Sequence, residues 1–292
     1  MMKKKGGKHM VFMATMDWYP TDDNPFSEDG EYGDAWSCFI YDNSIDDYSI
    51  NYPNTKVYTL RVSPAADKNY RRLFVFLNYE LSYGRNVILK VCDGMDGQKL
   101  LEEFYAHRGK EKPVVADYKY MVHSTTLDAW KSIQKQGALL SPNMLKKIGV
   151  NVKEIGLKPM LEPKDYSDYV MLDLLDGCGE LVVNSRNLGE ICTDPNISYS
   201  PGVRLYFSVE KILDAGLGIG DGVHLLKVKD CLPLENFLVD VISADMFPNI
   251  DNWTPIRKAM LLYHSIHSYF VFVSLASIHK TIGRHPNGPI SF

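Results

Sequence analysis

A short segment near the middle of the chain places one imidazole beside two hydroxyl groups. His123, Ser124 and Thr125 follow directly after an apolar run that ends at Val122. Imidazole and hydroxyl groups both donate and accept hydrogen bonds, so this corner is suited to hold a polar ligand at the edge of a sheet. The residue types favour ligand binding; the alternative is that His123 has only a structural role.

The residues around this corner predict the elements that position it. Residues 114–122 read as a strand, and residues 126–136 read as a helix whose apolar side chains recur at a spacing of three. Thr125 or Thr126 can cap the first turn of that helix through its hydroxyl group. Gly137 ends the helix, because glycine adopts a left-handed conformation at little cost.

This strand, corner and helix resemble the first motif of the ADP-ribosyltransferase superfamily, as found in poly(ADP-ribose) polymerases and RNA 2′-phosphotransferases. That motif is an apolar strand, His-Gly-Ser or His-Gly-Thr, a helix that contains an Ile, and then Gly-Leu. His123, Thr125, Ile133 and Gly137 stand at the matching positions, with a serine in place of the motif glycine. A second segment, Val203–Ser208, resembles the strand of the same family that carries Tyr-Phe-Ala or Tyr-Phe-Ser.

The resemblance implies a pocket for NAD. His123 would bond a ribose hydroxyl, the backbone at Ser124 and the hydroxyl of Thr125 would hold the nicotinamide carboxamide, and Tyr206 would pack against the nicotinamide ring. Ser208 would either contact the ligand or cap the helix that follows it. A nearby carboxylate would stabilise the positive charge that develops on the ribose as the glycosidic bond breaks.

Two family positions carry unexpected residues. The second aromatic ring that sandwiches the nicotinamide falls on Leu217. The family glutamate stands at the start of a late strand, and residues 236–241 fit that strand best. Asn236 then occupies the position of the glutamate, and Glu235 occupies it only if the strand carries a bulge. Residues 268–271 are a second candidate for this strand. These departures argue against chain elongation and leave single transfer, altered chemistry and NAD binding alone as open readings.

The wider pattern predicts two domains. Residues 1–113 alternate strand patterns over 56–62 and 86–91 with helix patterns over 70–83 and 98–105, which predicts a smaller α/β domain without a readable motif. The polar segment 107–113 marks the boundary. Residues 114–292 predict an α+β domain with a split, mainly antiparallel sheet of the ADP-ribosyltransferase type. Residues 143–200 read as a long irregular insertion within it.

Composition limits the alternatives. A formal charge of −4 gives no global attraction to nucleic acid, and no apolar run is long enough for a membrane span. The five cysteines are scattered and include no CxxC pair, which favours free thiols in the cytoplasm and no zinc site.

The leading hypothesis is therefore an NAD-dependent mono-ADP-ribosyltransferase, a glycosyltransferase that uses NAD as co-substrate and modifies a protein or nucleic acid, in the manner of a toxin-like effector. One alternative is an RNA 2′-phosphotransferase-like enzyme, although basic residues that would hold the phosphate are missing at the matched positions. Another is a catalytically inactive NAD-binding pseudoenzyme, favoured by the missing glutamate and by Leu217. The sequence does not determine the acceptor or the oligomeric state.

Overall fold

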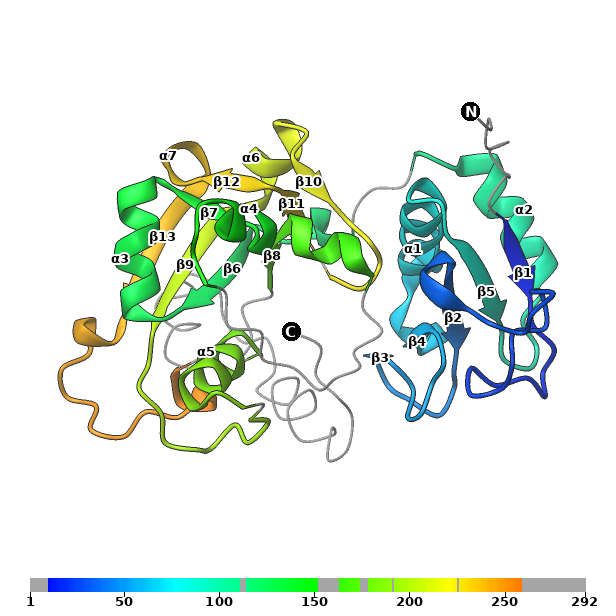
Figure 1. The fold of residues 1–292 in the computed structure, drawn as a ribbon, viewed down its shortest axis with the longest axis horizontal. Coiled ribbons are helices and arrows are strands. Elements are labelled where there is room, and N and C mark those ends of the chain that lie inside the picture. Colours follow the sequence, from blue (N-terminus) through cyan, green and yellow to red (C-terminus); the bar gives the residue numbers. More distant parts are fainter. Residues whose placement is uncertain are drawn as a thin grey trace. The chain divides into compact units, whose positions relative to one another are not determined.

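The computed structural model describes residues 10–110, 114–151, 163–173, 178–190, 192–224 and 226–258. The chain divides into two compact units (Figure 1). Unit 1 runs to Val114 and also includes residues 163–164 and Gly220–Val223, while the remaining described residues form unit 2. The main division lies next to the boundary expected after residue 113. The sequence did not predict that later segments return to unit 1.

Unit 1 is built on one five-stranded sheet. Its strands are β1 (Val11–Met13), β2 (Trp36–Tyr41), β3 (Tyr48–Ile50), β4 (Tyr58–Val62) and β5 (Asn86–Lys90). They lie in the order β1-β5-β2-β4-β3, with β3 antiparallel at one edge and the other strands parallel (Figure 1). Val87, Ile88 and Leu89 are fully buried, which is typical of a parallel strand that is covered on both faces.

Two helices complete unit 1, and both confirm the helices predicted near these positions. They are α1 (Arg71–Ser82), which links β4 to β5, and α2 (Gly97–His107), which follows β5. The Asp67 carboxylate binds the first turn of α1 by accepting from two backbone amides, at 2.7 and 3.0 Å. Asp96 caps α2 by accepting from the Lys99 amide at 3.0 Å. Each helix begins where a carboxylate satisfies its free N–H groups.

Unit 2 contains short antiparallel strands in separate sheets. The strands are β6 (Tyr120–Thr125), β7 (Ala138–Leu140), β8 (Tyr169–Leu172), β9 (Val203–Ser208), β10 (Gly218–Ile219), β11 (Leu226–Lys229), β12 (Cys231–Pro233) and β13 (Leu238–Ser243). They form sheets in the orders β13-β9-β6, β10-β11-β8 and β12-β7. The structure is thus a mixed α and β fold whose unit 2 sheets are antiparallel, as the sequence predicts.

Helices connect these strands. They are α3 (Leu127–Gln136), α4 (Pro142–Lys147), α5 (Cys178–Leu188), α6 (Val209–Asp214) and α7 (Leu234–Phe237). Single-turn 3₁₀ helices cover Gly33–Ala35, Pro64–Ala66, Lys68–Tyr70, Val114–Asp117, Lys164–Asp168 and Ala244–Met246. Gly137 ends α3 at a φ of 70°, as expected. Within the described residues, no helix is long and apolar enough to cross a membrane.

Three expectations for unit 2 were wrong. The strand expected over 114–122 begins only at Tyr120, after a 3₁₀ turn, and continues to Thr125, so the expected polar corner at residues 123–125 is part of the strand. The segment 143–200, expected to be irregular, contains α4, β8 and α5. The sequence of α5 lacks a clear helical pattern of apolar residues because part of its buried face is polar, including Glu180, Asn184 and Ser185.

The third wrong expectation concerns the late strand. Glu235 and Asn236 do not open it, because both lie in the helical turn α7, and β13 begins at Leu238. The turn is needed because β12 pairs with β7 whereas β13 pairs with β9, so the chain changes sheets between them. The second candidate strand at 268–271 lies outside the described residues.

Candidate functional site

His123 lies on β6 and its ring has one fixed hydrogen bond. Its Nδ1 is 3.2 Å from the carbonyl oxygen of Met171 on β8. A carbonyl oxygen can only accept, so Nδ1 carries the hydrogen and the neutral ring presents Nε2 as an acceptor. The pKa of His123 is lowered to about 4: burial is the largest cause, the positive charge of Arg186 adds to it, and the hydrogen bond with the Met171 carbonyl opposes both. The imidazole is therefore neutral near pH 7 and remains partly exposed.

The hydroxyl residues after His123 have structural partners. Ser124 donates from Oγ to Glu180 at 3.0 Å. Thr125 is buried, and its carbonyl oxygen lies so close to Gly202 that a Cβ there would come within 1.8 Å of it. Of the two possible caps for α3, the structure uses Thr126, whose Oγ1 accepts from the Ala129 amide at 3.2 Å. The hydroxyls of Ser124 and Thr126 therefore have roles in the fold.

Tyr206 does not join His123. In the pairing of β6 with β9, Tyr206 lies opposite Val122 and His123 lies opposite Leu205. Successive residues of a strand point to opposite faces, so His123 and Tyr206 lie on opposite faces of the sheet. Tyr206 is 1% exposed and packs with Val122 and Ile242. The expected stacking of Tyr206 on a nicotinamide held by His123 is wrong, because the strand register pairs His123 with the neighbour of Tyr206 and not with Tyr206 itself.

The remaining predicted site residues also lie apart from His123. Ser208 caps α6 by accepting from the Lys211 amide at 3.3 Å, which is the capping role left open by the sequence. The Leu217 amide donates to the Ile212 carbonyl at 3.1 Å and closes the end of the same helix.

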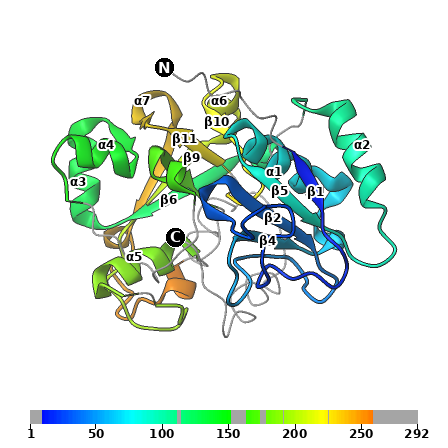
Figure 2. The same ribbon diagram turned by 45° about the vertical axis from the view of Figure 1, so that its right-hand side comes forward.

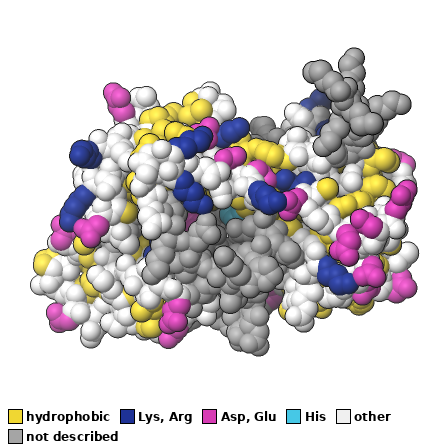
Figure 3. Space-filling model, in the orientation of Figure 1, with side chains coloured by type: hydrophobic (Ala, Val, Ile, Leu, Met, Phe, Trp, Pro, Cys, Tyr) yellow, Lys and Arg dark blue, Asp and Glu magenta, His cyan; other side chains and the backbone are white. Residues whose placement is uncertain are grey.

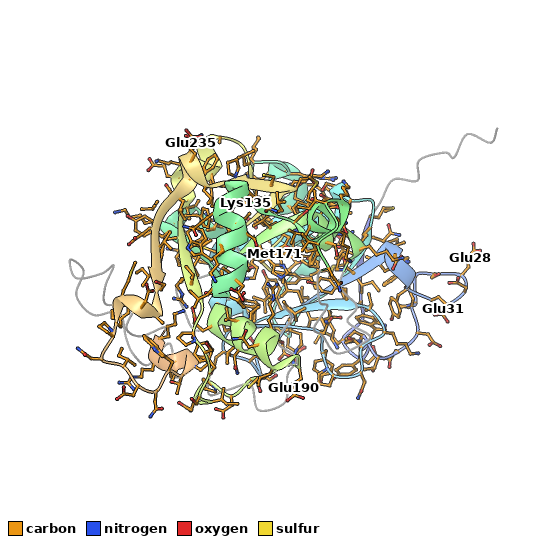
Figure 4. The ribbon with its side chains drawn as sticks, turned by 60° about the vertical axis from the view of Figure 1, so that its left-hand side comes forward. Glu28, Glu31, Lys135, Met171, Glu190 and Glu235 are labelled. Atoms are coloured by element: carbon orange, nitrogen blue, oxygen red, sulfur yellow. The ribbon has the colours of Figure 1, made fainter. Side chains whose placement is uncertain are left out.

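Glu235 and Asn236 lie on α7. Figure 4 shows Glu235 at one end of unit 2, well separated from Met171, the residue that holds the His123 ring. No bulge brings Glu235 into the strand that the resemblance requires, because the strand starts after it.

A buried ionic network lies on the other face of β6 and β9, and the sequence did not predict it. Its centre is Glu180 of α5, a helix that lies next to β6 (Figures 1 and 2). The Glu180 carboxylate accepts from Arg204 Nε at 3.1 Å and from Tyr199 at 2.5 Å, in addition to Ser124, and lies 3.2 Å from Lys258 Nζ. Glu180, Arg204 and Lys258 are each 0% exposed.

The charges of this network decide the ionisation of its members. Burial alone raises the pKa of Glu180, but Arg204, Lys258 and the Tyr199 hydroxyl outweigh it and hold the pKa at about 2. Burial lowers the pKa of Lys258, and the carboxylate opposes that change. One clue in the sequence was available: Arg204 interrupts an otherwise apolar strand, and an arginine in such a strand needs a buried partner.

The face of the sheet that carries His123 is otherwise apolar or uncharged. The strand register places on that face Met121 and Thr125 of β6, Val203, Leu205 and Phe207 of β9, and Leu238, Val241 and Ser243 of β13. Among these described strand positions, His123 is the sole titratable group. The arrangement can bind a hydroxyl-bearing ligand through Nε2, whereas these strands supply no carboxylate for bond cleavage. No family model, curated protein or solved structure matches the chain.

Proposed function

We propose that unit 2 is an NAD-binding domain of the ADP-ribosyltransferase type and that its reaction is mono-ADP-ribosyl transfer to a macromolecule. The observation that carries the proposal is the state of His123. Its Nδ1 is engaged by the Met171 carbonyl, its pKa of about 4 keeps the ring neutral, and its Nε2 can accept from a ribose hydroxyl. The strand that carries His123 and the capped helix after it follow the order that the family resemblance implies.

The geometry supports NAD binding more directly than it supports transfer. Tyr206 faces away from His123, and Glu235 and Asn236 lie on α7, so neither the stacking ring nor the carboxylate comes from the residues first expected. Loss of the ring removes about 0.5–1.5 kcal/mol of stacking. NAD binding without transfer is therefore the second candidate function, favoured by the absence of carboxylates at the described strand positions on the His123 face.

The test separates binding from chemistry. The full chain is heated with and without NAD, and in parallel it is incubated with labelled NAD and a cell lysate. A ligand at 100 times its dissociation constant stabilises the folded state by about 2.7 kcal/mol, which gives a measurable rise in the melting temperature. We expect this rise in the wild type and its loss in His123→Ala.

His107→Ala is the matched control, because His107 also bonds a carbonyl oxygen through Nδ1, at 3.0 Å, but lies exposed in unit 1. Label on protein or nucleic acid would support transfer, and stabilisation without label would support the second candidate. If NAD stabilises neither the wild type nor the control, the proposed function is wrong.

We also propose the cytoplasm as the place of action. Cys38, Cys92, Cys192 and Cys231 are free thiols, which suits a reducing compartment. Alkylation of these thiols in freshly lysed cells that express the protein would support the proposal, and their isolation as disulfides would contradict it.

A further inference from the structure

Unit 1 contains a pocket that the sequence motifs did not indicate. It has a volume of about 350 Å³ and lies where β2 and β5 end. The last residue of each strand and the three residues after it line the pocket, which are residues 41–44 and 90–93. Tyr19, Tyr52 and Arg61 also line it. Its volume is within the usual range for sites that bind small molecules.

The topology of the sheet explains why a pocket forms there. β2 and β5 are adjacent and parallel, and the chain leaves them in opposite directions. From β2 it passes to β3, which lies beyond β4 at one edge of the sheet, whereas from β5 it passes to α2, whose first residue, Gly97, packs against Met13 of β1 at the other edge. In open α/β sheets such a divergence leaves a crevice at the carboxyl ends of the strands, which is where ligands bind.

Lys90 places a buried positive charge in this crevice. Its side chain is 7% exposed, its Nζ donates to the Trp18 carbonyl at 2.5 Å, and it lies 3.9 Å from the centre of the Tyr19 ring. Among the described residues, no carboxylate lies within ion-pairing distance of it. An ammonium group has three donors and only one carbonyl acceptor is provided here. Burial accordingly lowers the pKa of Lys90, with nearby acids such as Asp17 opposing the change.

The other charged groups of the pocket are already satisfied or face water. Arg61 donates to Asp42 from Nε at 3.0 Å and from Nη2 at 2.5 Å, and the Ser44 amide donates to the same carboxylate at 2.7 Å. Asp93 is exposed. An incoming anion would therefore find its partner in Lys90, because a desolvated ammonium gains most from a negative group.

Planar groups flank the same space. Tyr19 is 50% exposed, and the Arg61 guanidinium lies 4.4 Å from the centre of the Tyr52 ring. Such surfaces accept flat rings by stacking. Acidic side chains are prominent on the surface of unit 1 (Figure 3), which disfavours a large polyanion such as nucleic acid. The pocket thus suits a small ligand with a local negative charge.

We propose that unit 1 binds a small molecule that carries a phosphate or carboxylate joined to a planar ring, with the anionic group on Lys90 and the ring against Tyr19. This site is independent of His123 and goes beyond the function proposed for unit 2. It makes unit 1 a ligand-binding module.

The experiment uses the full chain and isothermal titration calorimetry with three probes: AMP, benzoate and inorganic phosphate. AMP and benzoate distinguish a phosphate from a carboxylate ligand, and inorganic phosphate lacks the ring. We expect at least one ring-bearing probe to bind with a dissociation constant below about 1 mM. Lys90→Met should weaken that binding about tenfold or more, since it removes a charge-assisted hydrogen bond.

Controls keep the outcome specific. Lys56→Met removes an equal charge from an exposed lysine of unit 1, which pairs with Asp23, and should leave binding unchanged. His123→Ala should also leave it unchanged, which separates this site from unit 2. Tyr19→Ala truncates a half-exposed side chain and should weaken the ring-bearing probe but not inorganic phosphate. Absence of saturable binding by both ring-bearing probes, or equal binding by wild type, Lys90→Met and Tyr19→Ala, would overturn the proposal.

Discussion

Glu180→Gln is the substitution that most directly tests how unit 2 is held together. The change keeps the size of the side chain and removes its charge. Arg204 and Lys258, both fully buried, would then remain without a carboxylate between them. Tyr199 would also lose the acceptor that its hydroxyl contacts at 2.5 Å. A buried charge that has lost its counter-ion is strongly unfavourable.

Two independent routes give a similar size for the effect. Removing one partner of a buried ion pair typically costs about 3–5 kcal/mol. The pKa of Glu180 falls from 4.5 to about 2 in the folded protein, and a shift of this size corresponds to about 3 kcal/mol of stability at neutral pH. We expect Glu180→Gln to destabilise unit 2 by about 3 kcal/mol or more.

The assay is urea unfolding followed by hydrogen exchange and mass spectrometry, because peptides from the two units are then read separately. Peptides from β6, β9 and α5 should lose protection at lower urea concentration in the variant. Peptides from β5 in unit 1 serve as the internal reference. Glu190→Gln is the matched control, since Glu190 is exposed just after α5 (Figure 4).

The same network predicts the pH dependence. A carboxylate whose folded pKa is depressed contributes stability above its unfolded pKa and loses it as the pH falls through the folded value. The contribution of Glu180 should therefore fade between about pH 4.5 and about pH 2, and Glu180→Gln should show a flatter profile in that window. If the variant matches Glu190→Gln in urea and keeps the wild-type pH profile, the ionic network does not stabilise unit 2.

Three smaller predictions concern residues in β9 or directly beside β6 and β9. Thr126→Ala removes the cap of α3 and should cost about 1 kcal/mol in urea unfolding; an unchanged midpoint would show that the cap contributes nothing. Gly202→Ala places a Cβ within 1.8 Å of the Thr125 carbonyl oxygen and should lower the melting temperature of unit 2; wild-type melting would mean that the backbone yields easily. Tyr206→Phe should preserve the melting shift caused by NAD that His123→Ala abolishes, because the two side chains lie on opposite faces; loss of the shift in both variants would contradict this assignment.

Local patterns were sufficient for many elements. The helix α1 (Arg71–Ser82) forms where apolar residues recur at helical spacing, and α3 ends at Gly137, where a left-handed residue is required. The expected strands at β4, β5 and β9 also form. Each of these signals acts between residues a few positions apart, so one sequence contains all the information needed.

Which residues come together in the two sites depends on contacts between parts of the chain that are distant in the sequence. The Glu180 network joins α5 to β9 and Lys258, and the Lys90 pocket joins the ends of strands that are adjacent only in the sheet. No local spacing links these residues.

The sequence by itself determined that His123 and Tyr206 belong to two different strands. Tertiary structure alone decided that the two face away from each other, because the register pairs His123 with Leu205. Side chains alternate along a strand, so a shift of one residue in that pairing would reverse the outcome, and nothing in either strand taken separately specifies it.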